Sequence, residues 1–390
     1  MIRIAFVHNC FPAGGAERVT IDVARYLSRF GGYEVYVYAS RIADSLLTEE
    51  MRDYFTLRQI PKHSVPAKRS KQIERYIVED GVDILVQVVR SIRDIDGIRE
   101  RTGARSVIAC HGEPFWQRYA ITHRRQKGFV RRAMWFLFNK RRFADGSRAM
   151  RMAVERTLAE YNRCDAYTVL CEPYKTEVAA GIGIDPASSH IYAIENSEYV
   201  VDKVNYDKEN VVLFCGRFEN WSKRIDRLLR IWASVQHKMT SWRLVLVGGG
   251  EDWDGLKRMA EELSLERVSF EGHQKNVAAY YDKASVVVLT SETEGWGLTL
   301  TEGQARGCIA VAFGCSSGVK EVIGPNGEGG FVVTPFDEQE YAQRLVEIAA
   351  MSEEERLQMG KRAVEYRAQY CPEIIAEKWR NLFDHLGGKE

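Results

Sequence analysis

Residues 284–314 read ASVVVLTSETEGWGLTLTEGQARGCIAVAFG and contain two apolar runs separated by a polar segment. The runs, 284–290 and 308–314, have the length and composition of buried strands. Between them, Gly-Trp-Gly marks a turn, and the residues from about Gly297 onward suit a helix. A strand, a helix and a second strand in this order predict two parallel strands of a sheet that is covered on both faces.

The same alternation continues in both directions from this stretch. Further strands are predicted at 2–7, 33–40, 82–89, 104–112, 164–171, 189–196, 210–218, 242–250, 267–272 and 329–333. Residues 197–210 are polar and lack periodicity, which places the domain junction there. The sequence therefore predicts an α/β fold with two facing, Rossmann-like, doubly wound parallel-sheet domains. Their expected bounds are 1–198 and 199–371, and the amphipathic segment 372–390 is expected to cross back to the N-terminal domain.

The overall composition narrows the class of protein. The chain has 390 residues and a formal net charge of +1, so its total charge selects no partner. Its eight cysteines include no Cys-x-x-Cys pair, which favours reduced thiols in a reducing compartment. The N-terminus lacks the pattern of a signal peptide, and no apolar stretch approaches the roughly 20 residues that span a bilayer. We expect a cytoplasmic protein without a membrane span.

Two carboxylates, Glu294 and Glu302, flank the Gly-Trp-Gly turn with seven residues between them. The first amides of a helix that begins near Gly297 have no intrahelical partner and favour an anion such as phosphate. A carboxylate repels phosphate but accepts hydrogen bonds from both hydroxyls of a diol. The pattern therefore suits a diphosphate held between a sugar and a ribose, as in a nucleotide sugar. The alternative is that Glu294 merely caps the helix and Glu302 is solvated.

Other candidate groups lie at the ends of predicted strands, where open parallel sheets bind ligands. Arg217 and Lys223 lie at and after the end of 210–218, and two cations there could neutralise a diphosphate leaving group. Gly14 and Gly15 permit a tight turn after the first strand. His111 lies near the end of 104–112, where a neutral imidazole could bind a sugar hydroxyl. Each group also has a simpler explanation as a surface charge, a plain turn or a structural histidine.

Several of these segments together resemble the retaining glycosyltransferases of family 4, which have the GT-B architecture. The resemblance covers most of the chain and is strongest from about 211 to 335, where GRFENWSKRIDRLL (216–229), the Glu-x7-Glu element and GFVV (330–333) follow in order. Glu-x7-Glu is its most specific part. One departure lies in AIENSEY (193–199), where the family usually has Pro before the Asn and Gly after it. Glu195 and Ser197 take those places, a departure that concerns the hinge geometry and does not touch the donor residues.

The resemblance implies a role for each candidate residue. Glu294 would contact the transferred sugar, and Glu302 would bind the ribose diol. The diphosphate would be held by Arg217, Lys223 and the backbone amides of Gly297, Leu298 and Thr299. The loop at Gly272–His273 would lie near the base, Gly14 and Gly15 would approach the donor from the other domain, and His111 would help to position the sugar. The expected catalytic residues are Glu294, Arg217, Lys223 and His111. The family generally needs no metal, and no cofactor besides the nucleotide-sugar donor is expected.

The implied activity is transfer of a hexose or hexosamine from a nucleotide-diphosphate sugar to an acceptor hydroxyl, with retention of configuration. A uridine donor is favoured by its frequency in the family. The alternatives are a nucleotide-sugar-binding protein without transfer activity, a dinucleotide-dependent oxidoreductase and a metal-dependent transferase. GGGEDWDG (248–255) argues against the oxidoreductase, because Trp253 occupies the third glycine position of the dinucleotide fingerprint. The Asp-x-Asp patterns at 94–96 and 252–254 do not follow convincing strand ends.

A basic segment lies in the N-terminal half. Residues 115–163 contain many arginines and lysines, few acids, and the aromatic and aliphatic residues Phe129, Trp135, Phe136, Leu137 and Phe138. This mixture is typical of an element that lies on a membrane surface, so segment 118–156 is expected to bind anionic lipid. A lipid-linked glycan or surface-polysaccharide acceptor and a peripheral position at the inner face of the cell membrane would fit. The alternative is a solvated basic face, and nucleic acid is disfavoured because no recognised nucleic-acid module is present.

Overall fold

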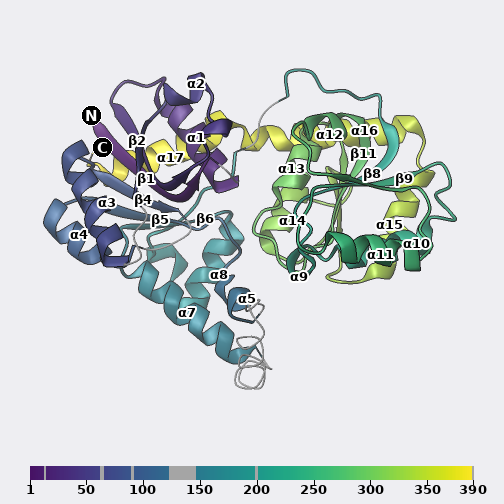
Figure 1. Ribbon diagram of the computed structural model, residues 1–390, viewed down its shortest axis with the longest axis horizontal. Helices are drawn as coiled ribbons and strands as arrows, with labels where there is room; N and C mark the ends of the chain where they lie inside the picture. Colours follow the sequence, from purple (N-terminus) through teal and green to yellow (C-terminus); the bar gives the residue numbers. More distant parts are fainter. Residues whose placement is uncertain (13–14, 62–65, 89–91, 123–145, 198–200, 389–390) are drawn as a thin grey trace. The chain divides into compact units, whose positions relative to one another are not determined.

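The computed structural model describes residues 1–12, 15–61, 66–88, 92–122, 146–197 and 201–388. It divides into two compact units (Figure 1). The first unit is Met1–Ser197 together with Pro372–Glu390, and the second is Glu198–Cys371. Each unit contains one parallel β-sheet with helices on both faces, so the predicted α/β class with two Rossmann-like sheets is confirmed.

The first sheet has seven strands in the order β3-β2-β1-β4-β5-β6-β7. Its strands are β1 (Ile2–Phe11), β2 (Tyr33–Ile42), β3 (Thr56–Gln59), β4 (Ile84–Val88), β5 (Arg105–Ala109), β6 (Ala166–Val169) and β7 (Ile191–Ala193). The chain builds outward from β1 to β3 and then returns to β4 on the other side of β1, which makes the sheet doubly wound. The edge strand β3 was not predicted, because TLRQ is mostly polar and half exposed.

Helices cover both faces of this sheet, and alternate residues of β1 show which helix lies where. Ala5 and Val7 share a buried cluster with apolar residues of α3 (Pro66–Asp80) and α4 (Ile95–Thr102). Phe6 points the other way and meets Trp379 and Phe383 of α17 (Pro372–Leu386), with ring centroids 6.4 and 6.2 Å apart. The C-terminal helix α17 also packs against α1 (Gly15–Leu27), so it forms part of the core of the first unit.

The remaining helices of the first unit follow the strands. They are η1 (Asp44–Leu46), α2 (Glu49–Arg52), α5 (Gln117–Thr122), α7 (Ser147–Tyr161), α8 (Glu172–Ile182) and η2 (Pro186–Ser188). Helix α7 packs against α5 and α8, and its buried residues Ala149, Ala153 and Thr157 recur every four positions. That spacing gives α7 one buried stripe and leaves its other side in solvent.

The second sheet has six parallel strands in the order β10-β9-β8-β11-β12-β13. They are β8 (Glu209–Cys215), β9 (Arg243–Val247), β10 (Val268–Gly272), β11 (Ala284–Leu289), β12 (Ile309–Phe313) and β13 (Gly330–Val333). The helices are α9 (Asn220–Lys223), α10 (Ile225–Val235), α11 (Trp253–Glu262), α12 (Ala278–Lys283), α13 (Leu298–Gln304), α14 (Ser317–Ile323), α15 (Glu338–Ala350) and α16 (Glu353–Arg367), followed by η3 (Ala368–Tyr370). This sheet is also doubly wound, and its order reverses between β8 and β11.

Strand β11 again shows which helices lie on each face. Val286 and Val288 belong to a core cluster with residues of α10, α11 and α15. Val287 faces the opposite way toward α13, where a Cβ at Gly303 would lie only 2.6 Å from its side chain. Gly303 therefore lets α13 lie close to the sheet, and the loop before α13 is held beside the carboxyl end of β11.

Candidate active site

The carboxyl ends of β8 and β11 lie side by side in the second sheet, because these two strands pair directly. The segment after β8 carries Arg217 in a loop and Lys223 at the end of α9, and the loop after β11 carries Glu294. The chain leaves β8 toward β9 on one side and leaves β11 toward β12 on the other, so the two connections run in opposite directions. Doubly wound sheets bind ligands at this switch point. The structure therefore brings the predicted Arg217, Lys223 and Glu294 to one edge of one sheet.

Lys223 and Glu294 form an ion pair across these two loops. Both side chains are only 17% exposed, so water screens the pair weakly. Further contacts join the same segments: the Thr290 hydroxyl lies 3.2 Å from the Lys223 carbonyl, and the Glu292 amide donates to the Ser222 carbonyl at 2.7 Å. The two charged side chains are thus held together by the backbone around them as well as by their own attraction.

The helical stretch after β8 is broken at Arg224, and this break determines where Lys223 lies. Arg224 has φ 48° and ψ 48°, a left-handed conformation that ends α9 and precedes α10. Lys223 is therefore the last residue of the short helix α9 and does not belong to α10. The Arg224 guanidinium donates to Asp226 at 2.9 Å, which helps to hold this turn.

A second set of ion pairs, absent from the sequence prediction, supports the Glu294 loop. Glu292 accepts from Arg224 at 3.1 Å and from Arg227 at 2.6 Å. Arg227 is buried, and its guanidinium lies 4.1 Å from the centre of the Phe336 ring. Two arginines that follow β8 in the chain, Arg224 and Arg227, thus bind the carboxylate of Glu292, two residues before Glu294. The sequence shows that Glu292 lies near Glu294, but it does not show which arginines bind Glu292. That pairing depends on the left-handed turn at Arg224.

Helix α13 begins at the predicted position. Gly297 has φ 87°, which favours glycine, and its carbonyl accepts from the amides of Leu300 and Thr301 at 2.8 and 3.3 Å. The amides of Leu298 and Thr299 precede these bonds and so have no intrahelical acceptor. Among the described residues, the buried Thr299 hydroxyl and Trp296 indole N–H have no hydrogen-bond partner. Hydrogen-bond donors therefore gather at the start of α13.

Glu302 is the fifth residue of α13 and is half-buried. It lies near Tyr281 of α12, whose pKa is raised well above its usual range by burial and by the negative charge of Glu302. Tyr281 is therefore a neutral hydroxyl beside the Glu302 carboxylate. The sequence prediction missed this neighbour, because a tyrosine in the apolar run before β11 is explained equally well by packing.

Arg217 differs from the paired lysine. Its side chain is 72% exposed and donates to Glu219 at 2.7 Å. Because Glu219 also opens α9, the Arg217 guanidinium is held near the start of that helix by a neighbour two residues away. His273 follows the edge strand β10 and is exposed, next to Gly272 with φ 70°. Both residues thus lie at the carboxyl edge of the second sheet.

The glycines at 248–250 serve backbone packing. Gly248 has φ 132°, and a Cβ there would lie 1.8 Å from the carbonyl oxygen of Gly216. A Cβ at Gly250 would lie 2.5 Å from the carbonyl oxygen of Phe218, and the Phe218 amide donates to the Gly249 carbonyl at 2.9 Å. The glycine-rich run therefore lets the loops after β8 and β9 touch, which explains it without a dinucleotide.

The candidate residues of the first unit occupy the carboxyl ends of β1 and β5. Gly15 is the first residue of α1, and Gly14 lies outside the described residues. His111 follows β5. This strand is the fourth of those predicted from the sequence and the fifth in the structure, because β3 was not predicted. Its Nδ1 lies 3.0 Å from Oδ1 of Asn196, and burial lowers the pKa of its imidazole below the usual range. His111 is therefore a neutral ring at neutral pH.

The basic segment 118–156 is described only at its two ends, up to 122 and from 146. Three arginines of the wider basic region form ion pairs: Arg118–Glu113 at 2.8 Å, Arg156–Glu160 at 3.0 Å and Arg163–Asp96 at 2.6 Å. Glu113 and Asp96 lie outside residues 115–163 but neutralise arginines within them. A count of charges within 115–163 alone therefore overstates the excess positive charge. Near the start of α7, exposed Met150 and Met152 flank exposed Arg151.

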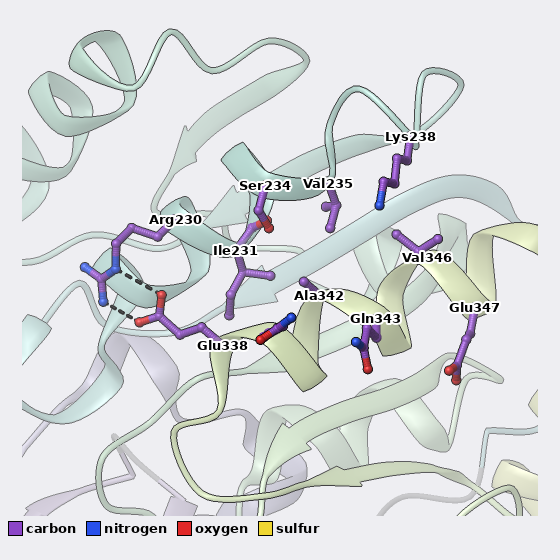
Figure 2. A pocket seen from close by; sticks show the side chains of 11 residues that line it. Arg230, Ile231, Ser234, Val235, Lys238, Glu338, Ala342, Gln343, Val346 and Glu347 are labelled. Carbon is purple, nitrogen blue, oxygen red and sulfur yellow. Dashed lines mark hydrogen bonds and ion pairs between the residues drawn. The ribbon is translucent and has the colours of Figure 1, made fainter.

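A cavity of about 560 Å³ lies elsewhere on the second unit, between α10 and α15. Figure 2 shows Arg230 and Glu338 paired at one end and the apolar side chains of Ile231, Val235 and Val346 along the cavity. The Arg230 guanidinium lies 2.5 Å from the Glu338 carboxylate. None of the candidate residues described above lines this cavity. It therefore belongs to the helical face of the unit and not to the site at the strand ends.

Membrane association through a spanning helix finds no support in the part of the chain that the structure describes, where no helix is both long and apolar enough to cross a bilayer.

Known proteins match both units. Residues 13–196 match the model of Glycosyltransferase Family 4, and residues 196–366 match Glycosyl transferases group 1. An uncharacterized glycosyltransferase of Haemophilus influenzae is 27% identical over 388 residues, which cover 97% of this chain and 98% of the relative. The GalNAc-alpha-(1->4)-GalNAc-alpha-(1->3)-diNAcBac-PP-undecaprenol alpha-1,4-N-acetyl-D-galactosaminyltransferase of Campylobacter jejuni is 21% identical over 393 residues, with 98% of each protein covered.

Among solved structures, Alr3699/HepE of Anabaena, determined with UDP and glucose, aligns with a TM-score of 0.73 at 16% identity. The alignment covers 99% of this chain and 100% of that one, so the two proteins share their fold. The family models, the full-length relatives and the two doubly wound sheets agree with one another, and the chain is a glycosyltransferase of family 4 with the GT-B architecture.

Proposed function

We propose that the chain transfers a hexose or hexosamine from a nucleotide-diphosphate sugar, with uridine as the base, to an acceptor hydroxyl with retained configuration. The Lys223–Glu294 pair beside the start of α13 is the observation that supports this proposal most directly. A cation, a carboxylate and backbone amides without an intrahelical acceptor thus lie at one edge of the sheet. These are the groups that a phosphate and a sugar require.

In this proposal each part of the donor meets a different group. Arg217, Lys223 and the amides that start α13, among them Leu298 and Thr299, bind the diphosphate. Glu302 accepts from the ribose diol, and Glu294 accepts from hydroxyls of the transferred sugar. Gly272–His273 lies beside the base. Gly15 and His111 of the first unit complete the donor contacts. No metal ion is needed, because the cations and amides offset the charge that develops on the leaving group.

The chemical step requires only the donor and the acceptor. The bond between the anomeric carbon and the phosphate oxygen breaks, and its electron pair stays on the leaving diphosphate. The acceptor oxygen bonds to the anomeric carbon on the same face, and the acceptor proton passes to the leaving phosphate oxygen. Arg217 and Lys223 stabilise this leaving group, so the chain needs no dedicated base.

The acceptor is proposed to be a lipid-linked or surface-polysaccharide precursor, met at the inner face of the cell membrane. The name of the Campylobacter jejuni relative describes an undecaprenol-linked substrate, which supports this class. The start of α7 supports it as well, because exposed Met150 and Met152 beside Arg151 suit the interface of an anionic bilayer.

A panel of nucleotide sugars tests the donor. Thermal unfolding is followed with each candidate, because a ligand that binds only the folded state raises its stability by mass action. We expect a uridine-diphosphate hexose or hexosamine to raise Tm most and to be turned over in the presence of a chelator, with an axial or equatorial product bond that matches the donor. Stabilisation without any turnover or hydrolysis would identify a binder. Stabilisation by a nicotinamide dinucleotide would contradict the proposal.

Liposome co-sedimentation tests the membrane contact. The double variant Arg148→Gln and Arg151→Gln should bind anionic vesicles less well than the unmodified protein, with no change on neutral vesicles. Arg156→Gln is the matched control, because this arginine lies on the same helix but pairs with Glu160. Equal binding of all three proteins to both kinds of vesicle would remove the membrane proposal and leave the donor assignment intact.

A further inference from the structure

Three consecutive side chains after β7 each bind a different part of the first unit. Glu195 accepts from Lys378 of α17 at 2.6 Å, and the Ser197 hydroxyl donates to Asp22 of α1 at 2.8 Å. Between them, Oδ1 of Asn196 lies 3.0 Å from Nδ1 of His111, the residue that follows β5. All three residues are buried, with 9% exposure at most. The backbone of Asn196 is therefore anchored on both sides of the residue that meets His111.

The partner of Nδ1 determines what the other nitrogen of His111 can do. A neutral imidazole carries its proton on one nitrogen and a lone pair on the other. An amide oxygen can only accept, so the proton must lie on Nδ1 when Oδ1 faces it. Nε2 is then the acceptor, and it can bind a hydroxyl hydrogen. Burial lowers the pKa of His111 and so favours this neutral ring over the imidazolium.

Among the described residues, the charged neighbours of His111 do not compete with Asn196 for Nδ1. The charged and titratable groups that act on it are His8 of β1 and Glu17 of α1. These two groups face each other instead, with Nδ1 of His8 3.4 Å from the Glu17 carboxylate and Nε2 of His8 3.0 Å from the Thr20 hydroxyl. In the described part of the chain, Asn196 is thus the side chain that meets Nδ1 of the His111 ring.

We propose that Asn196 is a positioning residue that holds His111 in the Nδ1–H tautomer, so that Nε2 presents a lone pair to a substrate hydroxyl. The inference rests on the proposed placement of His111 at the transferred sugar, and it adds how the ring is prepared to accept a hydrogen bond there. Glu195 and Ser197 restrain the segment but do not touch the ring.

Nitrogen NMR of 15N-labelled histidine measures the tautomer without any need for turnover. We expect the His111 ring of the unmodified protein to carry its proton on Nδ1, and Asn196→Ala to shift the ring toward the Nε2–H form. Ser197→Ala is the matched control: it removes a buried side-chain bond from the same segment, but should leave the tautomer unchanged. An Nε2–H ring in the unmodified protein, as an amide in the opposite orientation would produce, overturns the proposal.

Kinetics test the consequence for transfer. Asn196→Ala should lower kcat by about tenfold or more, because a misplaced contact at the reacting sugar is costly, while the Kd for free uridine diphosphate stays unchanged. Asn196→Asp keeps the acceptor atom and adds a charge that favours the imidazolium, so the acid limb of the pH–rate profile should move to higher pH. Ser197→Ala should change neither quantity.

The two proposals fail in distinguishable ways. A tautomer shift in Asn196→Ala with unchanged kcat and an unchanged pH profile overturns the role of Asn196. A chain that transfers no sugar from any nucleotide donor contradicts the proposed function, and the NMR measurement then still decides whether Asn196 sets the tautomer of His111.

Discussion

Lys223 donates directly to the carboxylate of Glu294, and each side chain is only 17% exposed. The proposed roles of these residues are different, since Lys223 would bind the diphosphate and Glu294 the sugar. In the structure each neutralises the other. Donor binding therefore has to replace this ion pair with a phosphate for Lys223 and hydroxyls for Glu294. Until such a ligand binds, the attraction within the pair offsets the cost of removing both charges from water.

Replacement of Glu294 by glutamine should uncouple donor binding from transfer. The amide still reaches Lys223 but has no negative charge, so we expect kcat to fall by about 10²- to 10³-fold. Calorimetry with free uridine diphosphate should give a Kd within a few-fold of the unmodified protein, because that ligand lacks the transferred sugar that Glu294 would contact. Glu302→Gln is the informative control and should weaken diphosphate binding through the ribose. Wild-type turnover by Glu294→Gln would contradict the assignment.

Substitutions of Arg217 and Glu219 should affect the donor in opposite directions. Arg217→Ala removes a cation from the leaving group and should lower kcat/KM by about 10²-fold or more. Glu219→Gln removes the anion that holds the Arg217 guanidinium at 2.7 Å. We expect it to tighten donor binding, because the diphosphate no longer competes with a carboxylate for the arginine. Steady-state kinetics over a range of donor concentrations measures both. Equal losses in the two variants would show that the pair acts as one structural unit.

Arg224 allows the backbone and the side chain to be separated. Glycine prefers the left-handed conformation found there, whereas a residue with a Cβ strains it by about 1 kcal/mol. Both Arg224→Gly and Arg224→Ala remove the bonds to Glu292 and Asp226. We therefore expect the same lowered kcat in both variants, with the glycine variant more stable by about 1 kcal/mol in urea unfolding. If only the alanine variant lost activity, strain and not the side chain would explain the effect.

His111 predicts how stability depends on pH. Its pKa is lowered by burial in the folded protein and lies near 6.5 in the unfolded chain. Below about pH 6.5, His111 binds a proton in the unfolded chain but not in the folded chain. The free energy of unfolding therefore falls as the pH drops toward the pKa of His111 in the folded protein. The loss is at most about 1.4 kcal/mol per pH unit. Above about pH 6.5 neither state is protonated, and the effect disappears.

The measurement compares the unmodified protein with His111→Gln, so that all other titrations cancel. As the pH falls from about 7 to about 5.5, the variant should gain Tm relative to the unmodified protein. A constant difference in Tm over this range would mean that His111 titrates alike in the folded and unfolded chains.

The fold and the family could be predicted from the sequence, because both depend on local patterns. The central strands β8, β11 and β12 are continuous apolar runs, which only a sheet buried on both faces explains. The edge strand β3 was missed for the opposite reason: three of its four residues are polar, and it is a strand only because β2 offers it hydrogen bonds. The identification as a family-4 glycosyltransferase is confirmed, and the site residues stay predictions.

What the sequence could not provide is the partner of each charged residue. Arg217 and Lys223 were treated as two equivalent cations, but Arg217 is exposed beside Glu219, whereas Lys223 is half-buried and paired with Glu294. The difference arises from the break at Arg224, which no propensity indicates for an arginine. Glu195 and Ser197 were a departure from the family pattern with no visible reason. Their partners Lys378 and Asp22 lie 183 and 175 residues away, so only the tertiary structure reveals them.

Helix α17 has a consequence for how the protein is made. Its Trp379 and Phe383 complete the core around Phe6, although the whole of Glu198–Cys371 is synthesised between them and β1. Domains usually fold in the order in which they leave the ribosome. Here the second unit is contiguous and can finish first, whereas the first unit must wait for residues translated almost 370 positions after its first strand. During that interval the apolar face of the first sheet that α17 covers, which includes Phe6, is exposed to water.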